Sequence, residues 1–178
     1  KAGITTWSLE EKASRLIKET GTEPAFLGYN DYSAALCVSI NEEVVHCLPS
    51  KRKIEPGDLV SLDLGIKYKG LNVDSATTVL IDGGDSQTDL KKKLMKATKE
   101  CLELGISVAK PGNTVGDISS VIQKHAEKSG FSVIRDLVGH GIGRGLHEEP
   151  EVPNFGKAGK GPKLEEGMVI AIEPMLTA

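Results

Sequence analysis

The sequence has few cysteines, no long apolar run and no excess of basic residues. Its three cysteines, Cys37, Cys47 and Cys101, form neither a paired framework nor a CxxC spacing. This usage excludes a disulfide scaffold and favours a reducing cytoplasm. No apolar run is long enough to cross a bilayer, and no signal peptide is present, so a membrane partner is not expected.

The charge balance is close to neutral and slightly acidic. The net charge is -3, the sequence pI is about 5.9 and charged residues make up 26% of the chain. Phosphate binding requires a basic face, so the composition argues against direct nucleic-acid recognition.

The 178 residues fit one globular domain with a sizeable core. We expect a single α+β domain over 1–178, with internal halves of about 1–85 and 86–178. Lys1 is not a start methionine, and Ala178 directly follows a strand pattern, so we expect a chain truncated at both ends.

An internal repeat organises the chain. The segment IEPGDLVSLD at 54–63 matches LEEGMVIAIE at 164–173, with a constant offset of 110 (164 − 54). Upstream, AGIT at 2–5 aligns with PGNT at 111–114 at an offset of 109 (111 − 2). The repeat predicts two similar halves, each with a helix and strands.

Apolar spacing predicts the elements of each half. A helix starts at Ser8, its counterpart ends at Gly130, and a longer helix with a solvated lysine face lies between them. The apolar stripes comprise Leu9, Ala13, Leu16 and Ile17; Ile118, Val121, Ile122 and Ala126; and Leu90, Leu94, Ala97, Cys101 and Leu104. Strands are predicted at 35–40, 59–64, 76–81, 131–134 and 168–172.

Carboxylates end both copies of the repeat. Asp63 and Glu173 occupy equivalent strand positions, where a lone carboxylate would be costly to bury. The segment Tyr68-Lys69-Gly70 predicts a hairpin turn that brings Asp74 beside Asp63. Because like charges repel at short range, we expect such a pair of carboxylates to share a bound cation.

Residues 139–147 read GHGIGRGLH and add two histidines, His140 and His147, in a glycine-rich segment. The segment lacks GK[ST], so it is not a phosphate loop, and the chain has no HExxH. Two aspartates, a glutamate and a histidine form an oxygen-rich donor set, which suits a hydrolytic site for Mn, Fe, Co or Zn. Pairs of such ions recur in aminopeptidases and phosphatases.

Four motifs resemble those of methionine aminopeptidases, in the family's order and over essentially the whole chain. They are SINEEVVH at 39–46, SLDLG at 61–65 with Asp74, GHGIGRGLHEEPEVPN at 139–154 and AIEPM at 171–175. The absence of a large insertion between His147 and Glu173 resembles the type I branch, which is bacterial and organellar. The resemblance implies the pita-bread fold, with two pseudo-twofold-related halves around a central antiparallel sheet. It also implies removal of N-terminal methionine before a small second residue.

The resemblance assigns roles to individual residues. Two divalent ions of unknown identity (Co, Mn, Fe or Zn) would be bound, with Asp74 as the bridging ligand and a fifth family ligand beyond Ala178. The metal ligands it implies are Asp63, Asp74, His140 and Glu173, and the catalytic residues are His46, His147 and Glu173. The implied substrate-binding residues are Tyr29, Tyr32, Cys37, His46, Leu146 and His147.

Three positions, Phe26, Cys47 and Leu146, depart from the family's usual residues and bear on selectivity. The implied partners are the N-terminal methionine of nascent peptides and the ribosome near its exit tunnel, and the implied state is a monomer in the cytoplasm. Two alternatives stay open: an aminopeptidase P or prolidase of the same fold, and a non-catalytic binding module. Cleavage of Xaa-Pro rather than Met-Ala peptides would indicate the first.

Overall fold

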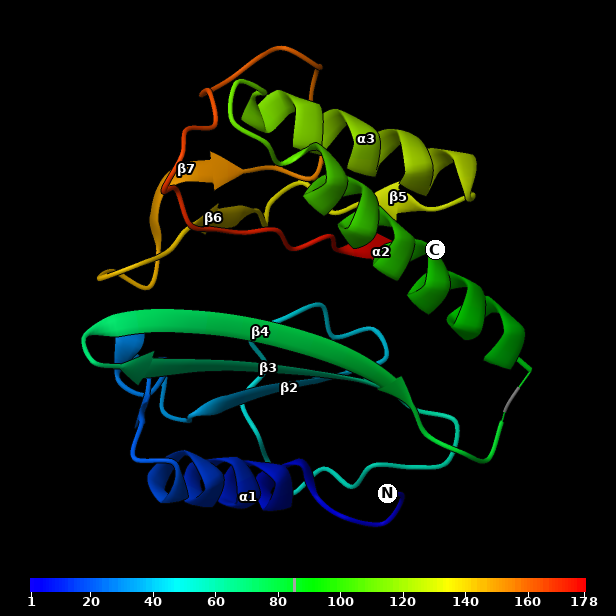
Figure 1. The fold of residues 1–178 in the computed structure, drawn as a ribbon. Coiled ribbons are helices and arrows are strands. Elements are labelled where there is room, and N and C mark those ends of the chain that lie inside the picture. Colours follow the sequence, from blue (N-terminus) through cyan, green and yellow to red (C-terminus); the bar gives the residue numbers. More distant parts are fainter. Residues whose placement is uncertain (85) are drawn as a thin grey trace. The chain divides into compact units, whose positions relative to one another are not determined.

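The computed structural model describes residues 1–84 and 86–178, whose contacts divide into two compact units (Figure 1). Unit 1 comprises Lys1–Lys91 and Arg144–Leu146, and unit 2 comprises Lys92–Gly143 and His147–Ala178. Position 85, where the sequence suggested the boundary between halves, lies outside the described residues.

Unit 1 is one helix and an antiparallel sheet. Strand β3 is central, because it pairs with β1 and β2 along one edge and with β4 along the other. The elements are α1 (Thr6–Glu19), β1 (Glu23–Pro24), the short 3-10 helix η1 (Tyr29–Asp31), β2 (Leu36–Ile40), β3 (Leu59–Tyr68) and β4 (Leu71–Leu80). Helix α1 lies along this sheet (Figure 1).

The two faces of the unit 1 sheet differ in polarity because side chains alternate along each strand. Val38, Ile40 and Val60 are buried on one face, against Leu9 and Ala13 of α1. Cys37 and Asp63 pair across β2 and β3 on the opposite face. The core of unit 1 therefore leaves the other face of the sheet for polar side chains.

Helix α1 differs in two respects from its prediction. It begins at Thr6 rather than Ser8, because the Thr5 hydroxyl caps it by accepting a hydrogen bond from the Ser8 amide at 3.1 Å. Leu16 is 46% exposed, whereas Glu10 is buried. The Glu10 carboxylate accepts hydrogen bonds from the amides of Ala35 and Leu36, which offset the cost of burying its charge.

Unit 2 contains most of α2 (Thr88–Val108), all of α3 (Val115–Lys128) and two small sheets. Its core is formed by α2 and α3 with the segments around them, and includes Cys101, Ile118, Ile122, Val152 and Leu164. In the larger sheet β6 (Gly139–Gly141) lies between β7 (Glu148–Val152) and β8 (Ile170–Ala171), and in the smaller one β5 (Ser132–Val133) pairs with β9 (Leu176–Thr177).

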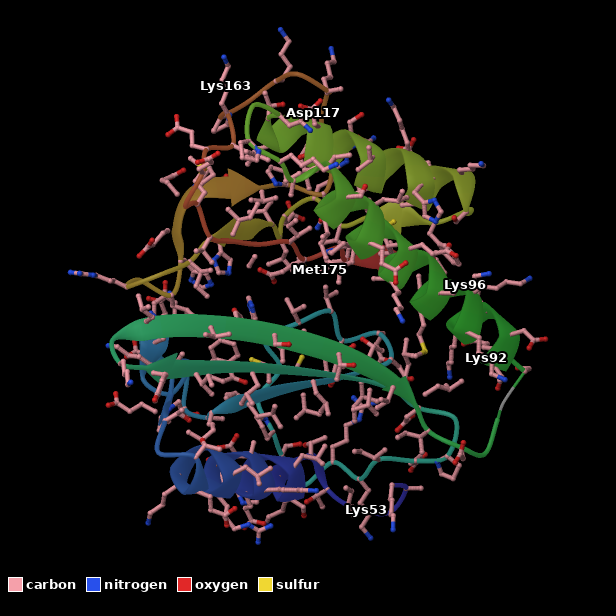
Figure 2. All side chains as sticks on the ribbon, in the orientation of Figure 1. Lys53, Lys92, Lys96, Asp117, Lys163 and Met175 are labelled. Carbon is pink, nitrogen blue, oxygen red and sulfur yellow. The ribbon has the colours of Figure 1, made fainter. Side chains whose placement is uncertain are left out.

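Helix α2 buries Ala97, Cys101 and Gly105, while Leu90 and Leu104 at the ends of the predicted stripe are 44% and 38% exposed. A Cβ on Gly105 would come within 3.2 Å of the Ile122 side chain, so the small residues mark the line of close helix contact. Lysines on the other side of α2 point outward, as Lys92 and Lys96 do in Figure 2. Among the described helices, none combines the length and apolarity that spanning a membrane demands.

The sequence repeat is confirmed as a structural repeat. Thr5 caps α1 and forms a bridge with Lys53, and Thr114 caps α3 and forms the equivalent bridge with Lys163. Lys163 and Asp117 both lie near the start of α3 in Figure 2. The strand pairs repeat as well: Pro24 pairs with Ile66, and Val133 with Leu176.

Candidate metal site and substrate pocket

The two aspartates of unit 1 lie on one face of the sheet. Asp63 of β3 pairs with Ala76, and Asp74 of β4 pairs with Gly65, so the two carboxylates are diagonal neighbours with a Cα separation of about 7–8 Å. The predicted turn is present: Lys69 and Gly70 have φ values of 50° and 81°, as a two-residue type I′ hairpin requires. The register set by the turn places the aspartates two residue pairs apart along the ladder rather than directly opposite each other.

A continuous ladder holds these aspartates in place. The register of β3 and β4 runs unbroken from Leu59–Leu80 to Tyr68–Leu71. On the aspartate face, the hydroxyls of Ser61 and Thr78 are hydrogen-bonded at 2.9 Å. The ladder therefore presents both carboxylates from backbone that has little freedom to shift.

In unit 2, His140 and Glu173 lie side by side. His140 is buried in β6, opposite Ala171, and its Nδ1 lies 2.8 Å from the Gly141 carbonyl oxygen. A carbonyl can only accept, so Nδ1 carries a proton, and in the neutral imidazole Nε2 then presents a lone pair. That Nε2 lies 3.2 Å from Oε1 of Glu173.

Glu173 Oε1 is a buried acceptor that accepts no hydrogen bond within the described part of the chain, although 36% of the side chain as a whole is exposed. Two electron-pair donors that close repel unless a positive charge lies between them. A divalent ion about 2.1 Å from each atom would span their separation and supply the positive charge. The pair therefore fits one metal ion.

Two glycines beside His140 are required by close strand contact. A Cβ on Gly139 would collide with the Ala171 carbonyl, and a Cβ on Gly141 would collide with the Glu149 carbonyl. The alternating glycines of the sequence therefore let β6 fit tightly between β7 and β8. This packing fixes the backbone on both sides of His140.

His147 contacts His140 and opens onto a cleft. The two rings meet edge to face, with centroids 4.3 Å apart and an interplanar angle of 84°. The cleft has a volume of about 350 Å³ and is rich in carboxylates. Its lining residues are Val138, His140, His147, Glu148, Glu149 and Glu151.

Tyr32 and Cys37 form a polar but uncharged cluster in unit 1. The Tyr32 hydroxyl is 3.1 Å from each of the Leu36 and Cys47 carbonyls, and burial raises its pKa. Burial also raises the pKa of the Cys37 thiol to about 11, and the charges of Asp63 and Asp74 add to this increase. Both groups are therefore protonated at neutral pH.

The other predicted pocket residues belong to unit 1 as well. Tyr29 is half-buried in η1, Leu146 is buried, and His46 is exposed in the loop after β2 with a φ of 59°. Phe26, which departs from the family pattern, is buried with its ring over Gly65, where any Cβ would collide with it. Since Gly65 pairs with Asp74, Phe26 packs beside the aspartate face.

The sequence interpretation missed two buried polar residues near these groups, Glu10 and Asn154. Glu10 accepts hydrogen bonds at the start of β2, and Asn154 donates one to the Glu173 carbonyl at 2.8 Å. An acidic residue next to the apolar stripe of a helix was an available signal for Glu10. Asn154 carried no signal beyond its place at the end of the 139–154 motif.

Within the part of the chain that the structure describes, no three His, Cys, Asp or Glu side chains gather as a metal site. The four predicted ligands instead form two pairs, one in each unit. Carboxylates and one imidazole, with no thiolate, are donors of hydrolytic rather than structural metal centres. Fold and donor set together define a metal-dependent hydrolase.

The chain belongs to metallopeptidase family M24, whose model matches residues 1–178. It is 47% identical over 178 residues to methionine aminopeptidase 1 of Bacillus subtilis (strain 168), covering 100% of this chain and 71% of the relative. The crystal structure of a methionine aminopeptidase from Thermotoga maritima superimposes with a TM-score of 0.92 at 47% identity, covering 97% of this chain and 68% of that one.

A prolidase from Pyrococcus horikoshii OT3 shares the fold at 28% identity, with a TM-score of 0.82, and the match covers 98% of this chain and 47% of that one. The predicted pita-bread fold and the use of divalent metal ions are thus confirmed by relatives of the same family.

Proposed function

We propose that this protein removes the N-terminal methionine from nascent proteins and peptides, as a dinuclear metalloaminopeptidase. The observation that carries the proposal is its 47% identity to a methionine aminopeptidase over the whole chain, against 28% to the prolidase. The aminopeptidase P or prolidase alternative is weaker on that difference. The paired donors support metal-dependent catalysis over a non-catalytic binding module.

The proposed metal ligands are Asp63 and Asp74 of unit 1 with His140 and Glu173 of unit 2. In support, the β3–β4 ladder holds both donors of unit 1, and the glycine-lined β6 holds His140 of unit 2. Divalent ions, when bound, would supply Lewis acidity that lowers the pKa of a water and polarises a carbonyl.

The proton transfers are assigned to side chains of unit 2. Glu173 takes the proton of the attacking water and passes it to the leaving amine. His147, in edge contact with His140 at the cleft, donates a hydrogen bond to the developing oxyanion. His46 lies on the exposed loop after β2 and is assigned to the substrate amine.

The proposed methionine pocket is lined by Tyr29, Tyr32, Cys37 and Leu146. The raised pKa values of Tyr32 and Cys37 keep these two groups neutral, which suits an unbranched thioether that carries no charge. The side chain of methionine is flexible and polarizable, so a small soft thiol beside an aromatic hydroxyl matches it.

The test is methionine release from Met-Ala-Ser, with Mn²⁺ or Co²⁺ added and with Phe-Ala-Ser and Ala-Pro as comparison substrates. Cleavage of Met-Ala-Ser alone is expected. Preferred cleavage of Ala-Pro would instead assign the protein to the prolidase branch. Metal binding without cleavage of any of the three would favour the binding module.

We further propose the cytoplasm as its location, a monomer as its state and the ribosome near the exit tunnel as a partner. These three rest on the family resemblance. Sedimentation of the protein with purified ribosomes, and its mass by light scattering, would test the last two.

A further inference from the structure

Asn154 is a fully buried polar side chain in the loop that follows β7, with an exposed fraction of 0%. Its Nδ2 donates a hydrogen bond to the main-chain carbonyl of Glu173 at 2.8 Å. We infer that Asn154 is a positioning residue, which fixes the backbone at Glu173 and thereby the carboxylate next to His140. The inference rests on the proposed role of Glu173 as a metal ligand.

The backbone at Glu173 needs such support because it lies beyond the strand ladder. Strand β8 ends at Ala171, and β9 begins at Leu176. Within the described chain, residues 172–174 belong to no strand, whereas Ala171 is still paired with His140 and the Met175 carbonyl accepts a hydrogen bond from the Ile134 amide. The hydrogen bond from Asn154 therefore holds the carbonyl of Glu173 in the interval between these two main-chain contacts.

The second polar atom of Asn154 indicates that the side chain does more than fill space in the core. Its Oδ1 is buried and has no hydrogen-bond partner among the residues that the structure describes. Leaving a buried acceptor unsatisfied costs stability, and an apolar side chain of the same shape would avoid that cost. What an apolar side chain cannot supply is the donor to Glu173.

A small shift of Glu173 has a direct consequence for the metal. Its Oε1 lies 3.2 Å from His140 Nε2, and an ion must reach both atoms at bonding distance. Groups that orient metal ligands typically change metal affinity or activity about 10–100-fold when removed. The loss of the Asn154 donor should fall in that range.

The test compares Asn154→Leu with Asn113→Leu as a matched control. Leucine matches the branched shape of asparagine, and the Asn113 Nδ2 also donates to a backbone carbonyl of unit 2, that of Val108, at 2.8 Å. The dissociation constant for Mn²⁺ is measured by isothermal titration calorimetry, with circular dichroism as the check on folding. We expect Asn154→Leu to weaken Mn²⁺ binding about 10–100-fold, and Asn113→Leu to leave it within about 2-fold.

The outcomes separate this inference from the proposed function. An unmodified protein that binds no Mn²⁺ would reject the assignment of Glu173 and the inference with it. An unmodified protein that binds, with a folded Asn154→Leu variant that binds equally well, would overturn the inference alone. Equal losses in both leucine variants would also overturn it, since the effect would then be general.

A measurement on the unmodified protein covers the case in which Asn154→Leu fails to fold. In a ¹⁵N-labelled sample, the side-chain amide signals of Asn154 and Asn113 are followed during titration with Zn²⁺. We expect the Asn154 signals to shift in step with metal binding and those of Asn113 to stay in place. Unshifted Asn154 signals at saturation would contradict the inference.

Discussion

The two units repeat one plan but hold their proposed metal ligands differently. In unit 1, Asp63 and Asp74 stand on a pair of ten-residue strands in continuous register. In unit 2, the counterpart of β3 is broken into two short strands, and Glu173 falls in the gap between them. In unit 2 the Asn154 side chain and the close contacts of Gly139 hold the backbone near the proposed ligands, as the β3–β4 ladder does in unit 1.

The comparison shows that a repeat can conserve the place of a carboxylate while replacing its support. Backbone pairing resists displacement through many cooperative hydrogen bonds, so a single side-chain change is absorbed. A support made of one amide and two glycines depends on each of them. Variants should therefore be better tolerated around Asp74 than around Glu173, except at the carboxylates themselves.

The largest effect is expected from the carboxylates. Asp74→Asn and Glu173→Gln should each lower kcat/KM by more than about 100-fold, because direct ligands matter more than the groups that orient them. Methionine release and Mn²⁺ affinity are the measurements, with the exposed Glu42→Gln and Glu166→Gln as controls in the same units. Full activity in Asp74→Asn with metal bound would refute the ligand assignment.

Glycine substitutions should separate the two kinds of support. Gly139→Ala drives a Cβ into the Ala171 carbonyl, so we expect a loss of about 1–3 kcal/mol in the free energy of unfolding and weaker Mn²⁺ binding. Gly70→Ala places a Cβ at a φ of 81° in the hairpin turn, with a loss of about 1–2 kcal/mol and no change in Mn²⁺ affinity. Urea unfolding and calorimetry measure the two quantities, and equal Mn²⁺ affinities in both variants would erase the distinction.

The equivalent helix positions Glu10 and Ser119 should respond unequally. Glu10→Gln turns an amide donor toward the N–H groups of Ala35 and Leu36, and should cost about 1–3 kcal/mol. Ser119 donates only to the Val115 carbonyl in its own helix, so Ser119→Ala should cost less than about 1 kcal/mol. Urea denaturation of the two variants tests this order, and a larger cost at Ser119 would reverse it.

The smallest effect is a pH dependence shared by one thiol in each unit. Burial raises the pKa of Cys37 and of Cys101 from 9.0 to about 11. The unfolded chain loses these protons first, so the stability they contribute is complete below pH 9 and declines as the pH rises toward 11. Cys37→Ala and Cys101→Ala should each flatten the decline in urea unfolding.

The Asp74→Asn variant tests whether the pKa values of the two thiols have different causes. It should lower the pKa of Cys37, because the Asp74 charge is one of the causes of the increase, and leave that of Cys101 unchanged. The rate of iodoacetamide alkylation as a function of pH reports both values. Equal shifts at the two thiols would contradict the assigned cause.

Much of the fold could be predicted because the repeat and the turn chemistry are local. The offsets of 110 (164 − 54) and 109 (111 − 2) predicted paired helices and strands, and Lys69-Gly70 predicted the hairpin. The start of α1 was misplaced because both Thr5 and Ser8 satisfy a cap, and only the bridge from Thr5 to Lys53 selects the first. Leu16 was assigned to the core, but Glu10 turns inward toward amides that lie 25 residues away in the sequence.

The sequence predicts the residue types of the proposed site but not the contacts that support them. Carboxylates and histidines are recognisable as potential metal ligands from their residue type, and the repeat relates Asp63 to Glu173. Asn154 reaches a carbonyl 19 residues away, and no periodicity or spacing encodes such a contact. The need for glycine at positions 139 and 141 likewise depends on which strands become neighbours in the fold.

The bridges from Thr5 to Lys53 and from Thr114 to Lys163 also bear on how the chain folds. Each ties the residue that caps its helix, α1 or α3, to a residue about fifty positions later, so the chain contains two successive closed loops. Hydrogen exchange should resolve these loops as two separate protection groups, each opening without the other. A chain organised in this way can complete one loop while the second is still leaving the ribosome.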